Sequence, residues 1–183
     1  MNDLEKLFDG HDPEVVIQTI ATFMDVFLKE SGMENDRIVQ GLLAGNTAAQ
    51  TMGLTREDLE VLYRLGFNAL SQGEIQKAHD VFYQLVTMDP LEAKNHYCMG
   101  VVKQAMGEFA VASDLFLNFL GLDATNPDGY LRYGECQLAL GDAQMAREAF
   151  ECAEAEAAKG NGDAVALTEA RSKLAMLNKE TVQ

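Results

Sequence analysis

The sequence predicts an all-α fold in which pairs of helices repeat along the chain. Four kinds of position recur three times at a spacing of 34 residues. They are the small residues Gly66, Gly100 and Gly134, the turn residues Gly73, Gly107 and Gly141, the alanines Ala78, Ala112 and Ala146, and the phenylalanines Phe82, Phe116 and Phe150. A fixed period of this length is typical of helix pairs that stack, each pair packing against its neighbours. Such an array indicates a binding scaffold and not a catalyst.

The recurring positions match a tetratricopeptide repeat, in which two helices approach each other at a small residue. Glycine on the first helix allows the close approach, and we expect the alanine of the second helix to make that contact. The phenylalanine one turn further on is then expected to fill the space between successive repeats. The second glycine of each repeat should end the first helix in a left-handed conformation, which glycine adopts without steric cost.

Three parts are expected along the chain. They are an N-terminal helical segment over residues 1–54, three tetratricopeptide repeats over residues 55–160, and a C-terminal capping helix with a tail over residues 161–183. The last helix should pass through Leu167, Leu174 and Leu177. A solenoid needs such an element because its final repeat would otherwise expose an apolar face.

The N-terminal segment carries a wide apolar stripe of its own. Asp12 and Pro13 predict the start of a helix, because Asp12 supplies an N-cap acceptor and the fixed φ angle of Pro13 suits the first turn. The apolar residues at helical spacing are Val16, Ile17, Ile20, Phe23, Met24, Phe27 and Leu28. This stripe must be buried, either on the first repeat or in a homodimer through Ile20, Phe23 and Phe27. The sequence leaves both possibilities open.

Between this stripe and the repeats, the sequence predicts a short helix, a turn and a helix start. A second short helix is expected over residues 37–44, followed by a turn at residues 45–47. Thr55 with Asp58 predicts a capping box, which would open the first helix of the first repeat.

The composition agrees with one compact protein and limits its partners. The chain has 183 residues, 48% of them hydrophobic, which is sufficient for a sizeable core. A net charge of −15 disfavours nucleic acid or direct membrane binding. The cysteines Cys98, Cys136 and Cys152 form no CxxC pair, so we expect reduced thiols in a cytoplasmic protein. We also expect no signal peptide, since the sequence starts with acidic residues, and no membrane span.

Several short motifs within the repeats are more specific than the period. They are Leu62-Tyr63, Leu65, Phe67-Asn68, Ala78-His79, Val81-Phe82 and Gln104-Ala105-Met106-Gly107, with Gly134-Glu135-Cys136 and Leu138 in the third repeat. In these residues the chain resembles the class II chaperones of bacterial type III secretion, which hold hydrophobic translocator proteins. Residues 45–47 resemble the Gly-Gly-Thr run that often precedes their first repeat, with Asn46 as a departure. The resemblance covers residues 43–158.

The first helices of stacked repeats line a concave surface, into which the fifth, ninth and twelfth residues of each repeat point. These residues are Tyr63, Phe67 and Leu70, then Tyr97, Val101 and Gln104, then Leu131, Glu135 and Leu138. Because the set is mostly apolar, it favours an extended peptide with spaced apolar side chains, and Gln104 is available to a backbone group. The resemblance implies that this peptide is a segment near a translocator's N-terminus. The alternative is that Tyr63, Phe67 and Tyr97 belong only to the core.

No pattern indicates catalysis, a metal or a cofactor. His11, His79 and His96 lack ligand spacing, and there is no phosphate-binding loop. Two functions remain in play. The first, implied by the resemblance, is a bacterial cytoplasmic chaperone whose partners are translocator proteins. The apolar N-terminal stripe adds the expectation that this chaperone forms a homodimer without cargo. The second is a tetratricopeptide-repeat adaptor or regulatory scaffold for other soluble proteins.

Overall fold

The computed structural model describes residues 29–32, 36–162 and 164–180, and these contain helices and no strand. The chain divides into two compact units, Met1–Gly53 and Leu54–Gln183. The predicted N-terminal helix lies outside the described residues, together with the dimer-contact residues Ile20, Phe23 and Phe27.

In the first unit, two short helices are described. Helix α3 (Arg37–Leu43) begins where the Asp36 carboxylate accepts hydrogen bonds from two backbone amides, as the sequence predicts for residues 37–44. Helix α4 (Ala48–Met52) follows the predicted turn and starts with a capping box between Thr47 and Gln50. The sequence did not predict α4, because five residues are too few to show a helical period.

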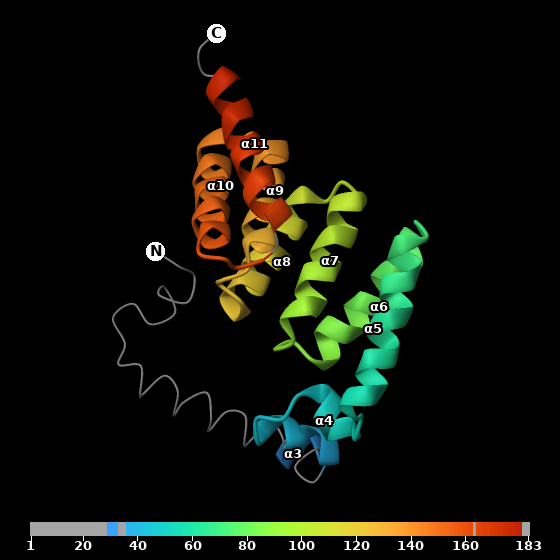
Figure 1. Ribbon diagram of the computed structural model, residues 1–183. Helices are drawn as coiled ribbons and strands as arrows, with labels where there is room; N and C mark the ends of the chain where they lie inside the picture. The colour runs from blue at the N-terminus through green and yellow to red at the C-terminus, as the bar shows by residue number, and fades with distance from the viewer. Residues whose placement is uncertain (1–28, 33–35, 163, 181–183) are drawn as a thin grey trace, which may run out of the picture. The chain divides into compact units, whose positions relative to one another are not determined.

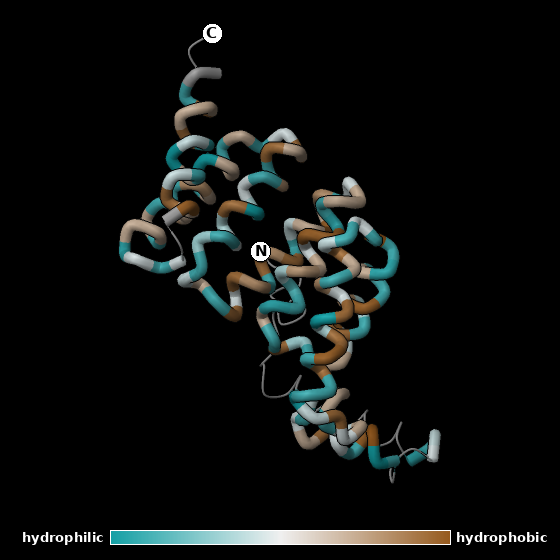
Figure 2. The backbone as a smooth tube through the Cα atoms, turned by 45° about the vertical axis from the view of Figure 1, so that its right-hand side comes forward, coloured by the Kyte–Doolittle hydropathy of each residue, from teal (hydrophilic) through white to brown (hydrophobic). Residues whose placement is uncertain are grey.

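The second unit consists of three helix pairs and a final helix (Figure 1). The helices are α5 (Arg56–Ser71), α6 (Ile75–Met88), α7 (Ala93–Ala105), α8 (Phe109–Leu122), α9 (Pro127–Leu140), α10 (Ala143–Ala158) and α11 (Ala164–Glu180). Each first helix packs on the second helix of its own repeat, and α7 and α9 also pack on the second helix of the preceding repeat. In addition, α7 neighbours both α5 and α9. Figure 2 shows hydrophobic and hydrophilic residues alternating along these helices, as expected for elements that bury one face. The predicted all-α repeat fold is confirmed.

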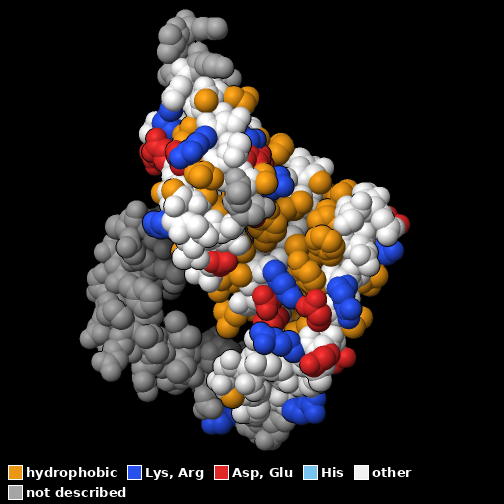
Figure 3. Space-filling view, viewed as in Figure 1, with side chains coloured by type: hydrophobic (Ala, Val, Ile, Leu, Met, Phe, Trp, Pro, Cys, Tyr) orange, Lys and Arg blue, Asp and Glu red, His pale blue; other side chains and the backbone are white. Residues whose placement is uncertain are grey.

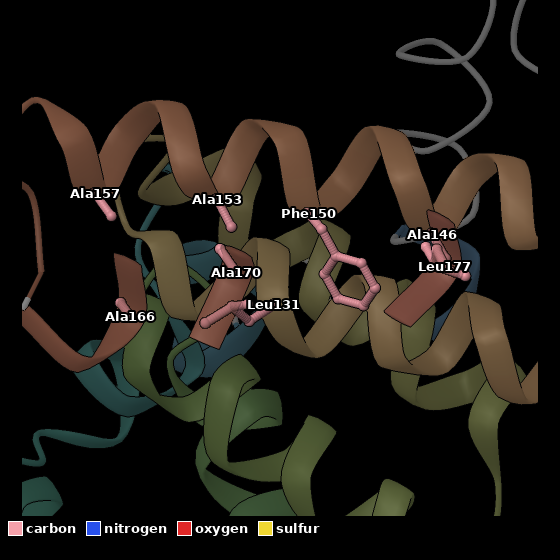
Figure 4. Packing of buried hydrophobic residues seen from close by; sticks show 8 residues of the cluster. All are labelled: Leu131, Ala146, Phe150, Ala153, Ala157, Ala166, Ala170 and Leu177. Atoms are coloured by element: carbon pink, nitrogen blue, oxygen red, sulfur yellow. The ribbon is translucent and has the colours of Figure 1, made fainter. Parts of the chain in front are cut away.

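At Gly100 and Gly134, the side chain nearest to the glycine is the phenylalanine of the same repeat. A Cβ added at Gly100 would lie 2.7 Å from the Phe116 ring, and one at Gly134 would lie 2.5 Å from the Phe150 ring. Figure 4 shows the Phe150 ring extending from α10 toward α9. The phenylalanine ring is thus the side chain nearest to the glycine of its own repeat, and Ala112 and Ala146 are themselves fully buried.

The first helices begin and end as predicted. Gly73, Gly107 and Gly141 follow α5, α7 and α9 with φ angles of 74°, 78° and 87°. Residues that have a Cβ atom rarely adopt this backbone conformation. The capping box is present at the start of α5, where the Thr55 hydroxyl accepts from the Asp58 amide and the Asp58 carboxylate accepts from the Thr55 amide.

Helix α11 closes the end of the repeat array, as the sequence predicts. Leu177, Ala166 and Ala170 are buried in one cluster with Phe150 and Ala153 of α10 (Figure 4). Leu167 and Leu174 pack against the same cluster. The helix therefore covers the apolar face of the third repeat.

Two of the three cysteines are shielded by this packing. Cys98 and Cys136 are buried, whereas Cys152 is exposed. Burial raises the pKa of the Cys98 thiol, and it raises the pKa of Cys136 to about 11.

We therefore expect Cys152 to be alkylated first in the native protein, because the thiolate is the reactive form. A pKa of about 11 instead of 9.0 lowers the thiolate fraction of Cys136 by roughly a hundredfold at neutral pH. Mass spectrometry after a short iodoacetamide pulse should find the label at Cys152, and at all three cysteines after unfolding. Early native labelling of Cys136 would contradict the packing of α9.

Candidate peptide-binding surface

All nine predicted peptide-contact residues lie on α5, α7 and α9, and we call the face they define the first-helix surface. Among them, Phe67 and Leu138 are exposed, while Leu131 is buried. The remaining members are partly buried; they are Tyr63, Leu70, Tyr97, Val101, Gln104 and Glu135. Figure 3 shows hydrophobic side chains gathered over α7 and between α7 and α11, with charged side chains below them in this view. The surface therefore has an apolar middle and a charged margin.

Aromatic rings connect this surface to the core. Tyr63 stacks against Phe67 with ring centroids 6.3 Å apart, and meets the core residue Phe82 edge to face at 5.8 Å. Tyr97 contacts Phe116 edge to face at 5.7 Å. The two tyrosines thus pack partly in the core, whereas Phe67 remains 50% exposed. Phe67 is the aromatic residue that a core role explains least.

Lys94 forms the charged margin beside Tyr63. Its ammonium nitrogen lies 4.3 Å from the centre of the Tyr63 ring and 2.6 Å from a carboxylate oxygen of Glu60. The hydrogen bond from Lys94 lowers the pKa of the Glu60 carboxyl. Burial raises the pKa of the Tyr63 hydroxyl, and the nearby Cys98 sulfur, 3.4 Å away, raises it further. The Tyr63 hydroxyl therefore stays protonated and neutral. The face of the ring attracts the Lys94 ammonium through a cation–π interaction.

At the third repeat, α11 changes what the predicted residues can do. Leu131 is only 4% exposed, because it packs in one cluster with Ala166 and Ala170 of α11. Glu135 pairs with Lys173 of α11 at 2.6 Å and with Arg132 at 3.1 Å. Both side chains therefore hold α11 in place, and they offer little to a peptide in this structure.

Gln104 is also engaged within the protein. Its side-chain nitrogen donates a hydrogen bond to the backbone oxygen of Arg132 at 3.4 Å. This hydrogen bond ties α7 to α9 and uses one N–H of the Gln104 amide.

Within the described residues, no group of three or more His, Cys, Asp or Glu side chains could hold a metal ion. The helices that are described there include none with the length and apolar character needed to cross a bilayer.

A helical-repeat unit of this kind, with an apolar face on its first helices, defines a tetratricopeptide-repeat scaffold. No protein-family model matches the chain. Among curated proteins, low calcium response locus protein H of Yersinia pestis is 34% identical over 65 residues, which make up 36% of this chain and 39% of that protein. The matched stretch thus spans well under half the length of these curated relatives.

Solved structures match over much longer stretches. PcrH in complex with the chaperone binding region of PopB is 30% identical, with 67% of this chain and 98% of that chain covered and a TM-score of 0.64. A T3SS complex from Aeromonas hydrophila is 29% identical, with 80% and 97% covered and a TM-score of 0.74. The translocator chaperone SycD of Yersinia enterocolitica is 26% identical, with 72% and 98% covered and a TM-score of 0.66. The chain belongs to the family of type III secretion translocator chaperones, as the resemblance in its repeats predicts.

Proposed function

We propose that this protein is a cytoplasmic bacterial chaperone that binds an extended segment of a hydrophobic translocator protein and keeps it soluble for export. The observation that carries the proposal is the apolar first-helix surface, on which Phe67 of α5 is half exposed. Solved relatives support it, because PcrH occurs in complex with the chaperone binding regions of PopD and PopB, and SycD with a peptide of YopD. The protein acts by stoichiometric binding and needs neither catalysis nor a cofactor.

The proposed peptide contacts lie mainly on the first two repeats. They are Tyr63, Phe67 and Leu70 of α5, Tyr97 and Val101 of α7, and the more distant Leu138 of α9. Apolar side chains of the peptide would enter the spaces between these residues, while its backbone remains extended. Leu131, Glu135 and Gln104 act indirectly, since they position α11 and α9.

Co-expression tests this function directly. Each candidate translocator is produced alone and together with the chaperone, and the soluble fraction is measured. A translocator that is insoluble alone should become soluble and should co-purify as a stoichiometric complex. If the protein instead captures only partners that are already soluble, it is an adaptor and the chaperone function is wrong.

We further propose that the protein forms a homodimer without cargo, through the apolar stripe at Ile20, Phe23 and Phe27. An apolar stripe of this width favours burial against a second copy. An alternative dimer has been described for SycD, which shows that a relative self-associates.

Phe23→Glu should therefore yield a folded monomer, because a charge in an apolar seam loses its hydration without gaining a partner. Sedimentation of the parent and the variant measures this change, and circular dichroism checks that the variant is folded. Cargo binding should be largely retained, since the proposed contacts lie on the repeats. A parent that sediments as a monomer at high concentration, or a variant that unfolds, would show that the stripe packs within its own chain.

A further inference from the structure

Helix α11 continues the register of the first helices one period further along the chain. The residue that a first helix buries against the preceding second helix recurs at Val102, Cys136 and Ala170, which are 34 residues apart and fully buried. Helix α11 packs on α10 and neighbours α9, as α9 packs on α8 and neighbours α7 (Figure 1). The helix therefore occupies the place of the first helix of a fourth repeat.

The small position of the repeat supports this register by its absence in α11. Gly66, Gly100 and Gly134 each lie close to the phenylalanine ring of their own second helix. One period later the chain has Thr168, which is exposed. No further helix follows α11 in the part of the chain that the structure describes, so no ring approaches this position and glycine is not needed. Helix α11 is thus half of a repeat.

The fifth and ninth residues of this half repeat are open. They are Val165, which is 65% exposed, and Glu169, which is also exposed. In a stack of repeats, residues at these positions point into the concave surface. The corresponding residues of α9 are Leu131 and Glu135, which α11 buries and pairs with. Val165 therefore takes the place of Leu131 as the accessible apolar residue at this end of the surface.

A cavity of about 220 Å³ lies between α7, α9 and α11. The fifth residues of three successive first helices line it, namely Tyr97, Leu131 and Val165. Because Tyr97 belongs to the first-helix surface, the cavity is continuous with that surface. The other residues of its wall are Asp128, Arg132, Glu135, Ala166 and Glu169.

The charges around the cavity favour a cation. The wall carries three carboxylates against one guanidinium, so its net charge is negative and it repels an acidic side chain. Glu135 is balanced within the protein, since it pairs with Arg132 and Lys173. Glu169 forms no ion pair among the described residues. Its carboxylate is thus accessible to a basic group of a ligand.

We propose that α11 is the fourth helix of the peptide-binding surface and that this cavity binds a lysine or arginine side chain of the translocator segment. The inference rests on the proposed chaperone function. The aliphatic stem of the basic side chain lies on Val165 and Tyr97, and its charge lies beside Glu169. The bound segment therefore spans four first helices, and its basic residue lies at the opposite end from the residues that contact Phe67.

The test uses synthetic peptides that cover the binding segment of the translocator solubilised in co-expression. Each Lys and Arg of the peptide is replaced by Glu in turn, and binding to the full-length chaperone is measured by calorimetry. Glu169→Lys should bind the unmodified peptide about threefold more weakly, the size expected for an ion pair near the surface. It should bind one of the replaced peptides more tightly than the parent protein does, because the exchanged charges attract each other again.

Two matched controls separate this contact from general effects. Glu151→Lys makes the same change of charge at an exposed residue of α10, a second helix, and should favour no single replaced peptide. Val165→Ser should weaken peptide binding by about threefold, the size expected for losing an apolar contact of one methylene group. Val111→Ser should leave binding unchanged, because this valine has 45% exposure and lies on α8. Thermal melting checks that each variant is folded.

The outcomes distinguish this site from the function on which it rests. Peptide affinities of Val165→Ser and Glu169→Lys equal to those of the parent would overturn the contact on α11 and leave the chaperone function intact. A loss with Val165→Ser, without a replaced peptide that regains affinity for Glu169→Lys, would overturn the basic ligand. If no translocator is solubilised in co-expression, the chaperone function fails, and the site on α11 fails with it.

Discussion

Replacing Phe116 by alanine should lower the free energy of unfolding by ~3–5 kcal/mol, the range for removing a buried aromatic ring. The ring is fully buried, and it fills the space against Gly100 of α7. A cavity would remain there, because the glycine has no side chain to fill it and the surrounding helices are held by their own repeats. Urea denaturation followed by circular dichroism measures the loss.

Leu117→Ala is the control for this substitution, since it removes an apolar side chain from the next position of α8. Leu117 is 48% exposed, so its replacement should change the free energy of unfolding by less than about 1 kcal/mol. Similar losses for both variants would contradict the repeat packing described above.

Phe67→Ala should weaken cargo binding by ~1–3 kcal/mol, the size expected for an aromatic residue that anchors a peptide. The fold should be retained, because half of the Phe67 side chain is exposed and its contact is with Tyr63 and not with the repeat glycine. Calorimetry with the co-purified translocator segment measures the change, and thermal melting checks the fold.

Tyr83→Ala is the matched control for binding. Tyr83 is an aromatic residue of α6 with 61% exposure, and it belongs to a second helix and not to the first-helix surface. Its replacement should leave cargo affinity unchanged. Equal affinities of the Phe67→Ala variant and the parent would remove Phe67 from the proposed contacts.

Much of the repeat fold could be predicted because its determinants are local. A left-handed residue after each first helix needs glycine, and α5 starts at the capping side chain of Thr55. The contact partner of the small glycine was predicted less well. Its identity depends on how far a side chain on another helix reaches, which the spacing along the chain does not contain.

In the candidate site, too, features set by local sequence could be predicted, and features set by distances between helices could not. Helical spacing correctly places Tyr63, Phe67 and Tyr97 on first helices, since side-chain direction along a helix follows from sequence position. The engagement of Gln104 with α9 depends on the distance between two helices and could not be inferred from spacing.

The sequence by itself determined the helical class, the repeat period and the positions where helices start and stop, because each depends on residues within a turn or two of one another. The tertiary structure alone decided which side chains of the first-helix surface stay accessible. Helix α11 buries Leu131 and pairs with Glu135 through Lys173. Likewise, the buried Oδ1 atom of Asn95 lacks a hydrogen-bond donor only because α6 and α7 meet there. Accessibility and hydrogen-bond satisfaction depend on everything packed around a group, and those neighbours are brought together only when the chain folds.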